Sequence, residues 1–242
     1  MLFKKDFFTF YFGDKQDQID KNLYETYKDN YFLKNSCFDS LKKRINSRSF
    51  FFLKQTHSTL GIVLDKENIK NAPSFSFEGD YIITKLQNIA IGVMTADCLP
   101  IIFYDKENHT AAVAHAGWRG SAKMIAKKVV QQMNKEFQTK QEDFQVFFGP
   151  SAKVCCYKVG DEVISALKKI NFLDDVIVKK NNDFYFDLPL LNKKILLQSG
   201  VASERINMQY NLCTICNDDF CSYRRKKGDP YRQMSVISLL AI

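Results

Sequence analysis

Six short apolar runs between residues 49 and 150 constrain the fold of this chain more than any other feature of its sequence. Most of them contain few polar residues and are too short for helices, which is typical of strands buried in a sheet. Several follow one another too closely for a helical crossover, so some neighbouring strands must run antiparallel. The runs comprise residues 49–55, 81–84, 89–95, 100–105, 110–116 and 144–150. We therefore predict a mixed sheet.

Helices are predicted beside these strands. Residues 121–137 place apolar side chains every four positions among Lys and Gln, and Ser121 can cap the first turn. Further helices are predicted near 160–170 and at 188–199, with Gly200 ending the latter. Strands interleaved with helices indicate an α/β fold.

The domain organisation is predicted from the absence of a linker sequence. No stretch rich in Pro, Gly or Ser divides it, so we expect a single domain over residues 1–242, with mixed β-sheets flanked by helices. A hydrophobic content of 45 % suffices for a large core. The first residues show no secretion signal, and no run reaches the ~18 apolar residues that span a bilayer. We expect a cytoplasmic monomer with no membrane partner.

The net charge of +8 raises the question of nucleic-acid binding. The basic residues are scattered, however, and the densest clusters are only "KKRINSR" (42–48) and "RRKK" (224–227). The sequence contains no zinc finger, homeodomain or RNA-recognition signature. We therefore expect no nucleic-acid partner, and we interpret the charge as a solvated basic surface or as complementary to an anionic substrate.

Two histidines and a cysteine fall at the ends of predicted strands. These are His57, Cys98 and His115, whereas His109 lies in a polar turn and is expected to be exposed. Seven cysteines, an odd number, in a chain without a secretion signal indicate reduced thiols. Two imidazoles and one thiolate form a three-ligand set for zinc with a fourth position open, as in catalytic sites. Alternatively, Cys98 could be a nucleophile and His115 its base.

A second group of cysteines, in "CTICNDDFC", offers a rival site. Cys213, Cys216 and Cys221 could hold structural zinc or an iron–sulfur cluster, with a fourth ligand from Cys155 or Cys156. Small buried thiols are the simpler interpretation. We expect Cys213, Cys216 and Cys221 to be free thiols without metal.

Several uncommon motifs occur in an order that resembles one known family. The two longest matches are "TADCLPIIFYD" and "VAHAGWRGS", and the others are "QTH", "GDYIIT", "GPSAKVCCYKVG", "FDLPLLNKKILLQSGV", "CT" and "FCSYRRKKG". Together they resemble the YfiH/laccase-domain family, also called multi-copper polyphenol oxidoreductases and purine nucleoside phosphorylases. The resemblance implies an α/β/β/α-type fold and zinc bound by His57, Cys98 and His115.

The resemblance also implies an activity. Family members are reported to cleave purine nucleosides with phosphate and to deaminate adenosine. A laccase reaction is disfavoured, because three histidines cannot supply both a blue-copper centre and a three-copper cluster, so zinc is favoured over copper. Deamination suits zinc, which lowers the pKa of bound water. The expected partners are therefore a purine nucleoside and phosphate.

Roles for individual residues follow from this implied activity. The expected catalytic residues are Asp97, Cys98 and His115, with Asp97 as a proton carrier or merely a turn cap. Arginine binds phosphate well because its guanidinium group is planar, and the residues expected to bind phosphate are Arg119, Arg224 and Arg225.

The chain departs from the family pattern at two positions. Tyr11 stands where the family usually has an arginine thought to help bind phosphate, and Lys158 stands where it usually has a glutamate. Because of Tyr11 we expect phosphorolysis to be weaker than in typical members, and both departures leave the identity of the substrate open. Two other activities stay open, namely editing of peptidoglycan precursors, which is named for some bacterial members, and metal-free hydrolysis by Cys98 and His115.

Overall fold

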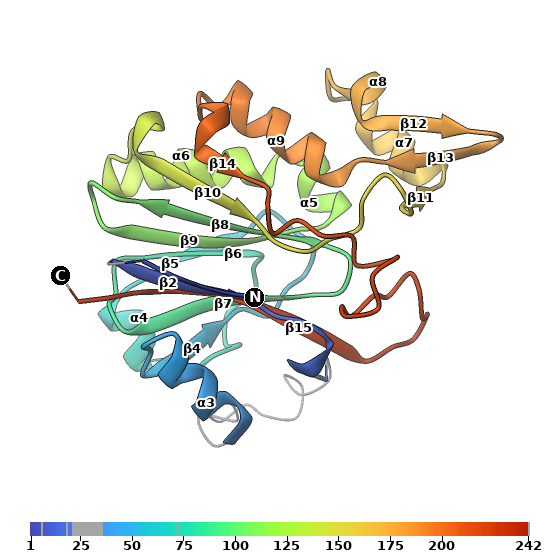
Figure 1. Ribbon diagram of the computed structural model, residues 1–242. Helices are drawn as coiled ribbons and strands as arrows, with labels where there is room; N and C mark the ends of the chain where they lie inside the picture. The colour runs from blue at the N-terminus through green and yellow to red at the C-terminus, as the bar shows by residue number, and fades with distance from the viewer. Residues whose placement is uncertain (6, 18, 21–35, 72, 242) are drawn as a thin grey trace.

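The computed structural model describes all residues except 6, 18, 21–35, 72 and 242. Two six-stranded sheets of the described chain lie face to face, with helices against the outer face of each (Figure 1). This confirms the predicted α/β fold with mixed sheets and helices on both sides.

The first sheet has the strand order β1-β2-β15-β7-β4, and the short β3 pairs with β15. Only β4 and β7 run parallel, and the other pairs are antiparallel. The longest strand, β15, lies between β2 and β7, so a late segment of the chain occupies the middle of the sheet. The strands are β1 (Leu2–Lys4), β2 (Phe8–Phe12), β3 (Ile19–Asp20), β4 (Ser49–Phe52), β7 (Ile89–Thr95) and β15 (Tyr231–Leu239).

The second sheet has the order β14-β10-β8-β9-β6-β5. Its centre is the β8–β9 hairpin, in which Pro100 pairs with His115. The strands are β5 (Gly61–Leu64), β6 (Tyr81–Thr84), β8 (Leu99–Asp105), β9 (Thr110–Ala116), β10 (Phe144–Phe148) and β14 (Ile206–Asn207). A small third sheet contains β11 (Lys158–Val159), β12 (Ile177–Lys180) and β13 (Asp183–Phe186).

All six predicted strands are present, although β4 and β10 end a few residues before the predicted limits. The helices are α3 (Ser36–Arg44), α4 (Lys66–Asn71), α5 (Trp118–Ala122), α6 (Ile125–Phe137), α7 (Asp161–Leu167), α8 (Leu173–Val176) and α9 (Leu188–Gln198). Short 3-10 turns are η1 (Lys15–Asp17), η2 (Gln141–Asp143) and η3 (Ser203–Arg205). The helices predicted near 160–170 and at 188–199 correspond to α7 and α9.

The helix predicted over residues 121–137 is wrong in its first part. The chain forms two helices there, α5 and α6, because Met124 takes a left-handed backbone conformation with φ of 64° between them. Ser121 lies inside α5 and caps neither helix; its buried hydroxyl accepts a hydrogen bond from Asn192 instead. The break lets the short α5 follow directly from the end of β9.

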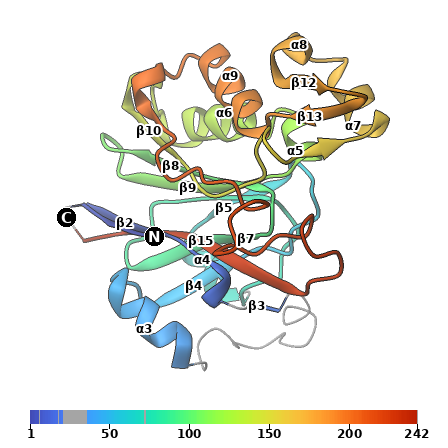
Figure 2. The same ribbon diagram turned by 45° about the vertical axis from the view of Figure 1, so that its right-hand side comes forward.

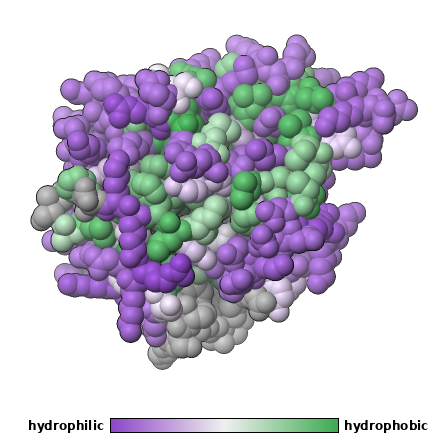
Figure 3. Space-filling model, in the orientation of Figure 1, coloured by the Kyte–Doolittle hydropathy of each residue, from purple (hydrophilic) through white to green (hydrophobic). Residues whose placement is uncertain are grey.

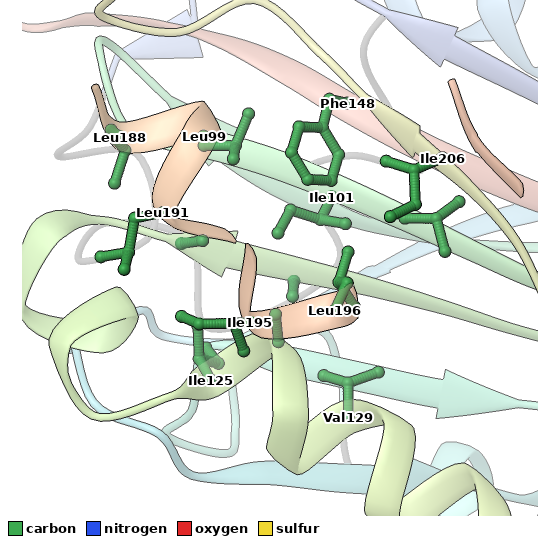
Figure 4. Packing of buried hydrophobic residues seen from close by; sticks show 14 of the residues in the cluster. Leu99, Ile101, Ile125, Val129, Phe148, Leu188, Leu191, Ile195, Leu196 and Ile206 are labelled. Atoms are coloured by element: carbon green, nitrogen blue, oxygen red, sulfur yellow. The ribbon is translucent and has the colours of Figure 1, made fainter. Parts of the chain in front are cut away.

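Three apolar layers hold the molecule together. Between the two sheets lie aromatic side chains such as Phe8, Phe10 and Tyr104. Above the second sheet, α6 and α9 bury Leu, Ile and Val residues against the strands (Figure 4). Beneath the first sheet, Leu41 and Ile45 of the α3 region pack on its outer face.

The surface agrees with this layering. Hydrophilic residues cover most of the face in Figure 3, and apolar residues gather chiefly in its middle part. Among the helices of the described residues, none is both long enough and apolar enough to cross a membrane.

Candidate metal centre and substrate cavity

The structure brings the three predicted ligands together from three segments. His57 lies in the loop between β4 and β5, Cys98 in the turn between β7 and β8, and His115 near the end of β9. One potential ligand atom from each lies within 4.8 Å of the other two. Cys98 Sγ lies 3.9 Å from His57 Nε2, and the two imidazole rings are 4.8 Å apart at 75°.

His109 does not join this group. It lies in the turn before β9, as predicted, but it is half-buried rather than exposed. Its ring nitrogens face the Tyr104 hydroxyl at 3.2 Å and the Leu240 carbonyl at 3.0 Å. These contacts give His109 a structural role separate from the ligand group, although it lies only six residues before His115 in the sequence.

A carboxylate that sequence reasoning did not single out organises the site. Asp80 is almost fully buried, and its Oδ1 lies 2.8 Å from His115 Nδ1, so the other ring nitrogen of His115 is free to face Cys98. The same carboxylate accepts hydrogen bonds from the backbone N–H of His57 at 3.1 Å and from that of Ser58 at 2.6 Å. Asp80 therefore fixes one ligand through its ring and another through its backbone. The feature of the sequence that could have identified Asp80 is its position directly before β6, the strand that pairs with β9.

The charges of the site are strongly coupled. Burial alone would raise the pKa of the Cys98 thiol, but the neighbouring His115 and His57 lower it to about 6. Burial alone would lower the pKa of His115, but the Cys98 thiolate and Asp80 raise it to about 10. Burial opposes ionisation of Asp80 as well, yet hydrogen bonds from His115 and Ser58 lower its pKa to about 2. The resulting thiolate and carboxylate favour a cation at this place.

The backbone around the ligands is constrained. His57 and Asp97 both have positive φ, 58° and 82°, which is uncommon for residues with a side chain. Gly117 follows β9, and a Cβ built there would lie 2.9 Å from Cys98 Sγ and 3.1 Å from His57 Cδ2. Only glycine therefore leaves room for the ligands at that position.

The donor set fits a zinc ion. Two imidazoles and a thiolate are preferred zinc ligands, and in a tetrahedral site with the usual bond lengths a sulfur and a nitrogen lie about 3.5 Å apart. The 3.9 Å between Cys98 Sγ and His57 Nε2 is close to this value. Asp80 supplies the hydrogen bond to the non-ligating nitrogen that metal-binding histidines usually make.

The ligand group opens into a cavity of about 380 Å³. Its walls combine aromatic rings with guanidinium groups, and Arg119, Arg224 and Arg232 are all among the lining residues. The lining comprises Leu53, Gln55, His57, Met94, Ala96, Asp97, Cys98, His115, Trp118, Arg119, Tyr157, Tyr223, Arg224 and Arg232. A positively charged, partly aromatic cavity suits a ligand that has both an anionic group and a flat ring.

Two of the predicted phosphate binders line this cavity and the third does not. Arg119 pairs with Glu162 at 2.8 Å and lies over the Trp118 ring. Arg225 instead donates to the carbonyls of Thr214 and other residues of the loop that follows, so its guanidinium holds that loop. Arg232, at the start of β15, lines the cavity, whereas Arg225 does not. The sequence could not show which of Arg225 and Arg232 lines the cavity, because both flank the same polar turn.

Asp97 also has a definite set of partners. One of its carboxylate oxygens accepts a hydrogen bond from Thr214 Oγ1 and the other from the backbone N–H of Arg224, both at 2.7 Å. The carboxylate thus ties the turn that carries Cys98 to the C-terminal loop.

The two departures from the family pattern lie outside the cavity lining. Tyr11 is buried in β2, and its hydroxyl donates to Asp17. Lys158 is exposed and pairs with Asp183, and only its carbonyl touches a lining residue, Arg224. Neither residue therefore lines the cavity, and the expectation that Tyr11 weakens phosphate binding stays a prediction.

These features define a class of protein: an α/β/β/α fold in which a His₂Cys group that could hold a metal ion lies in an arginine-lined cavity. The family model described as multi-copper polyphenol oxidoreductase laccase matches residues 12–240. The chain belongs to this family.

Named relatives agree with this assignment. A purine nucleoside phosphorylase from Clostridium acetobutylicum is 34% identical over 238 residues, which cover 97% of this chain and 93% of the relative. A protein named adenosine deaminase, from an unknown prokaryotic organism, is 38% identical over 181 residues, covering 71% of this chain and 68% of the relative. The crystal structure of the hypothetical protein YfiH from Bacillus licheniformis has the same fold, with a TM-score of 0.78 at 24% identity over 96% of this chain and 92% of that one.

Proposed function

We propose that this protein is a zinc-dependent enzyme of purine nucleosides, which cleaves adenosine, inosine and guanosine with phosphate and deaminates adenosine. The observation that carries the proposal is a single cavity that contains both the His57–Cys98–His115 set and three guanidinium groups. The names of the relatives support the same substrates.

His57, Cys98 and His115 would hold the zinc ion and leave a fourth position open toward the cavity. When bound, zinc supplies Lewis acidity and lowers the pKa of water. Asp80 keeps a proton on Nδ1 of His115, so that the other nitrogen can offer its lone pair. Copper would bind similar donors, but zinc needs no further copper sites to act.

The three lining arginines would bind phosphate. Each already has a partner: Arg119 bonds Glu162, Arg224 donates to the Lys158 carbonyl, and Arg232 donates to nearby carbonyls. A guanidinium has five N–H donors in a planar fork, so each retains donors for an oxyanion.

The aromatic lining residues would hold the purine. Arg119 lies 4.2 Å from the centre of the Trp118 ring, and Arg224 lies 4.9 Å from that of Tyr157, so one face of each of these rings is occupied. Tyr223 is 48% exposed, and its ring is open for stacking on a flat base.

Asp97 positions the site in this proposal and does not carry a proton. Both of its oxygens are already hydrogen-bonded, to Thr214 and to the backbone of Arg224. Arg225 acts in the same way, because its guanidinium holds the loop that includes Thr214.

The proposal is tested by separating its two reactions. Inosine cleavage is followed by chromatography at increasing phosphate concentration, and adenosine deamination is followed without phosphate. In Arg224→Gln we expect the KM for phosphate to rise roughly tenfold or more, because a charge-assisted hydrogen bond contributes about 1.5–3 kcal/mol. Deamination should change little. Arg205→Gln, at an exposed arginine outside the lining, is the matched control. Absence of turnover with every nucleoside would contradict the proposal.

One observation favours a second candidate, a metal-free thiol hydrolase. Asp80, His115 and Cys98 are arranged as an orienting acid, a base and a nucleophile. Prolonged dialysis against a chelator distinguishes the two candidates. The zinc enzyme should lose activity and regain it with added zinc, whereas a thiol hydrolase should keep its activity and lose it only on alkylation of Cys98.

A further inference from the structure

Four cysteine sulfurs form a second group, outside the cavity lining. They belong to Cys155 and Cys156, which follow β10, and to Cys213 and Cys216, which follow β14. All four sulfurs lie within 4.8 Å of one another, and those of Cys155 and Cys216 are 4.0 Å apart. Cys221, from the same motif, is buried and does not belong to the group.

The two segments are held side by side by hydrogen bonds that do not involve sulfur. Ser151 N–H donates to the Leu212 carbonyl, and Thr214 N–H donates to the Ser151 carbonyl, each at 3.0 Å. The buried Asn211 side chain donates to the carbonyl of Gly149 at 2.7 Å. Figures 1 and 2 show the same proximity between the segment after β10 and the segment that leads to β15. The cysteines are therefore brought together by the fold itself.

The surroundings of Cys213 suit a thiolate that binds a metal ion. The backbone N–H groups of Cys216, Lys153 and Ile215 donate hydrogen bonds to its sulfur. Two of these donors come from the turn that begins at Cys213 itself, which wraps its amides around the sulfur. Such N–H donors stabilise the negative charge of a thiolate that binds a metal ion.

The geometry fits one ion rather than a cluster. In a tetrahedral zinc site with Zn–S bonds of about 2.3 Å, neighbouring sulfurs lie about 3.8 Å apart. The measured 4.0 Å between Cys155 and Cys216 is near this value, and no pair exceeds 4.8 Å. An iron–sulfur cluster has several iron atoms between its cysteine ligands and requires a wider spread of sulfurs. Four thiolates with no water ligand are typical of structural zinc.

We propose that Cys155, Cys156, Cys213 and Cys216 bind a single structural zinc ion, in addition to the ion at His57, Cys98 and His115. This proposal replaces the sequence-based expectation of free thiols at Cys213 and Cys216, and it takes up the alternative in which Cys155 and Cys156 supply ligands, with both of them in the set and Cys221 outside it. Cys221 remains a buried thiol outside the set.

The proposed ion would fix one wall of the substrate cavity. Tyr157 follows Cys156 and lines the cavity, and Thr214 follows Cys213 and donates to Asp97. The ion would thus join two segments distant in sequence that both reach the cavity. Cys155 and Cys216 are exposed, so an ion can enter from solvent.

The test uses Co²⁺ as the probe in a Cys98→Ala variant, in which the first site is disabled. After removal of metal under reducing conditions, we expect this variant to take up about one Co²⁺ per chain, with intense thiolate-to-cobalt charge-transfer absorption that added zinc abolishes. The additional change Cys216→Ser should remove the absorption, whereas Cys221→Ser, the matched control, should leave it unchanged. A folded Cys98→Ala protein without this absorption would overturn the proposal.

A second measurement covers the case in which Cys216→Ser does not fold. With Cys98→Ala alone, bound zinc should protect Cys155, Cys156, Cys213 and Cys216 from an alkylating reagent, as read by peptide mass spectrometry. Equal labelling with and without zinc, or a disulfide between any two of the four, would refute the site. Nucleoside turnover is not part of either readout, so failure of the proposed function and failure of this site are distinguishable.

Discussion

One buried carboxylate, Asp80, links the two histidine ligands through its hydrogen bonds to the His115 ring and to the backbone of the His57 loop. In Asp80→Asn the amide can donate to Nδ1 of His115, which moves the ring proton to the nitrogen that should bind metal. We expect zinc affinity to fall about 10- to 100-fold. Competition with a chromophoric chelator measures this, and Glu78→Gln, an exposed carboxyl two residues away, is the control. Unchanged affinity would show that Asp80 does not orient the ligand.

The same carboxylate makes stability depend on pH. The pKa of Asp80 is about 2 in the folded protein, since hydrogen bonds from His115 and Ser58 outweigh burial, against a usual value of 3.8. A lowered folded pKa stabilises the protein above the unfolded pKa, and this stabilisation is lost as the pH falls through the folded value. Above pH 4 we expect the free energy of unfolding of the metal-free wild-type protein to be about 2 kcal/mol higher than that of metal-free Asp80→Asn.

That difference should shrink between pH 4 and pH 2 and vanish below it. Urea unfolding at a series of pH values measures it. A difference that is constant over this range would mean that the carboxylate charge is not the source of the stabilisation.

At this scale the sequence predicted the three residues that gather at the candidate metal site, but not the residues that support them. His57, Cys98 and His115 could be chosen because few residue types bind zinc and all three lie at strand ends. Asp80 and Arg232 could not, since aspartates and arginines are common and their roles depend on which strands become neighbours. Arg225 lies in a turn and bonds the loop that includes Thr214, whereas Arg232 lies at the start of β15 and lines the cavity.

At the scale of elements, the junction between β9 and α5 is the tightest part of the site. Gly117 has an ordinary φ of −70°, so space rather than backbone conformation requires glycine there. In Gly117→Ala the added methyl would press on Cys98 Sγ and His57 Cδ2. We expect loss of most bound zinc, measured by elemental analysis, with the circular dichroism spectrum retained.

Gly160→Ala is the matched control for this substitution. Gly160 also precedes a helix, α7, and a Cβ there would meet nothing within 4 Å. If both variants keep their zinc, the close contacts at Gly117 are not a constraint on the site.

Among the elements, the buried strands could be predicted from the sequence, whereas the break between two helices and the pairing of distant strands could not. The runs that became β6 to β9 are continuous and apolar, so hydrophobicity alone located them. The break between α5 and α6 lies at Met124, which is neither Gly nor Pro and gives no local signal. The pairing of β15 between β2 and β7 joins distant segments, and no local pattern specifies such a pairing.

At the scale of the whole molecule, the aromatic layer between the two sheets contributes much of the stability of the fold. The Phe10 ring is fully buried and lies 4.7 Å from that of Phe147 and 5.5 Å from that of Tyr210. We expect Phe10→Ala to lower the free energy of unfolding by about 3–5 kcal/mol, as measured in denaturant. Phe7→Ala, at a residue that is 36% exposed just before the same strand, should cost far less. Equal losses would contradict this account of the core.

The place of β15 in the first sheet has a consequence for biosynthesis. On the ribosome β2 emerges early, but one of its two described partners, β15, is made more than two hundred residues later. At about 5–20 residues per second, a strand rich in phenylalanine must wait ten seconds or more before the sheet can close. Tyr223, Arg224 and Arg232 arrive in the same late segment. Until β15 is made, the nascent chain therefore exposes an apolar strand with an unpaired edge to chaperones and neighbouring chains, and the cavity is complete only after the segment that contains β15 has emerged.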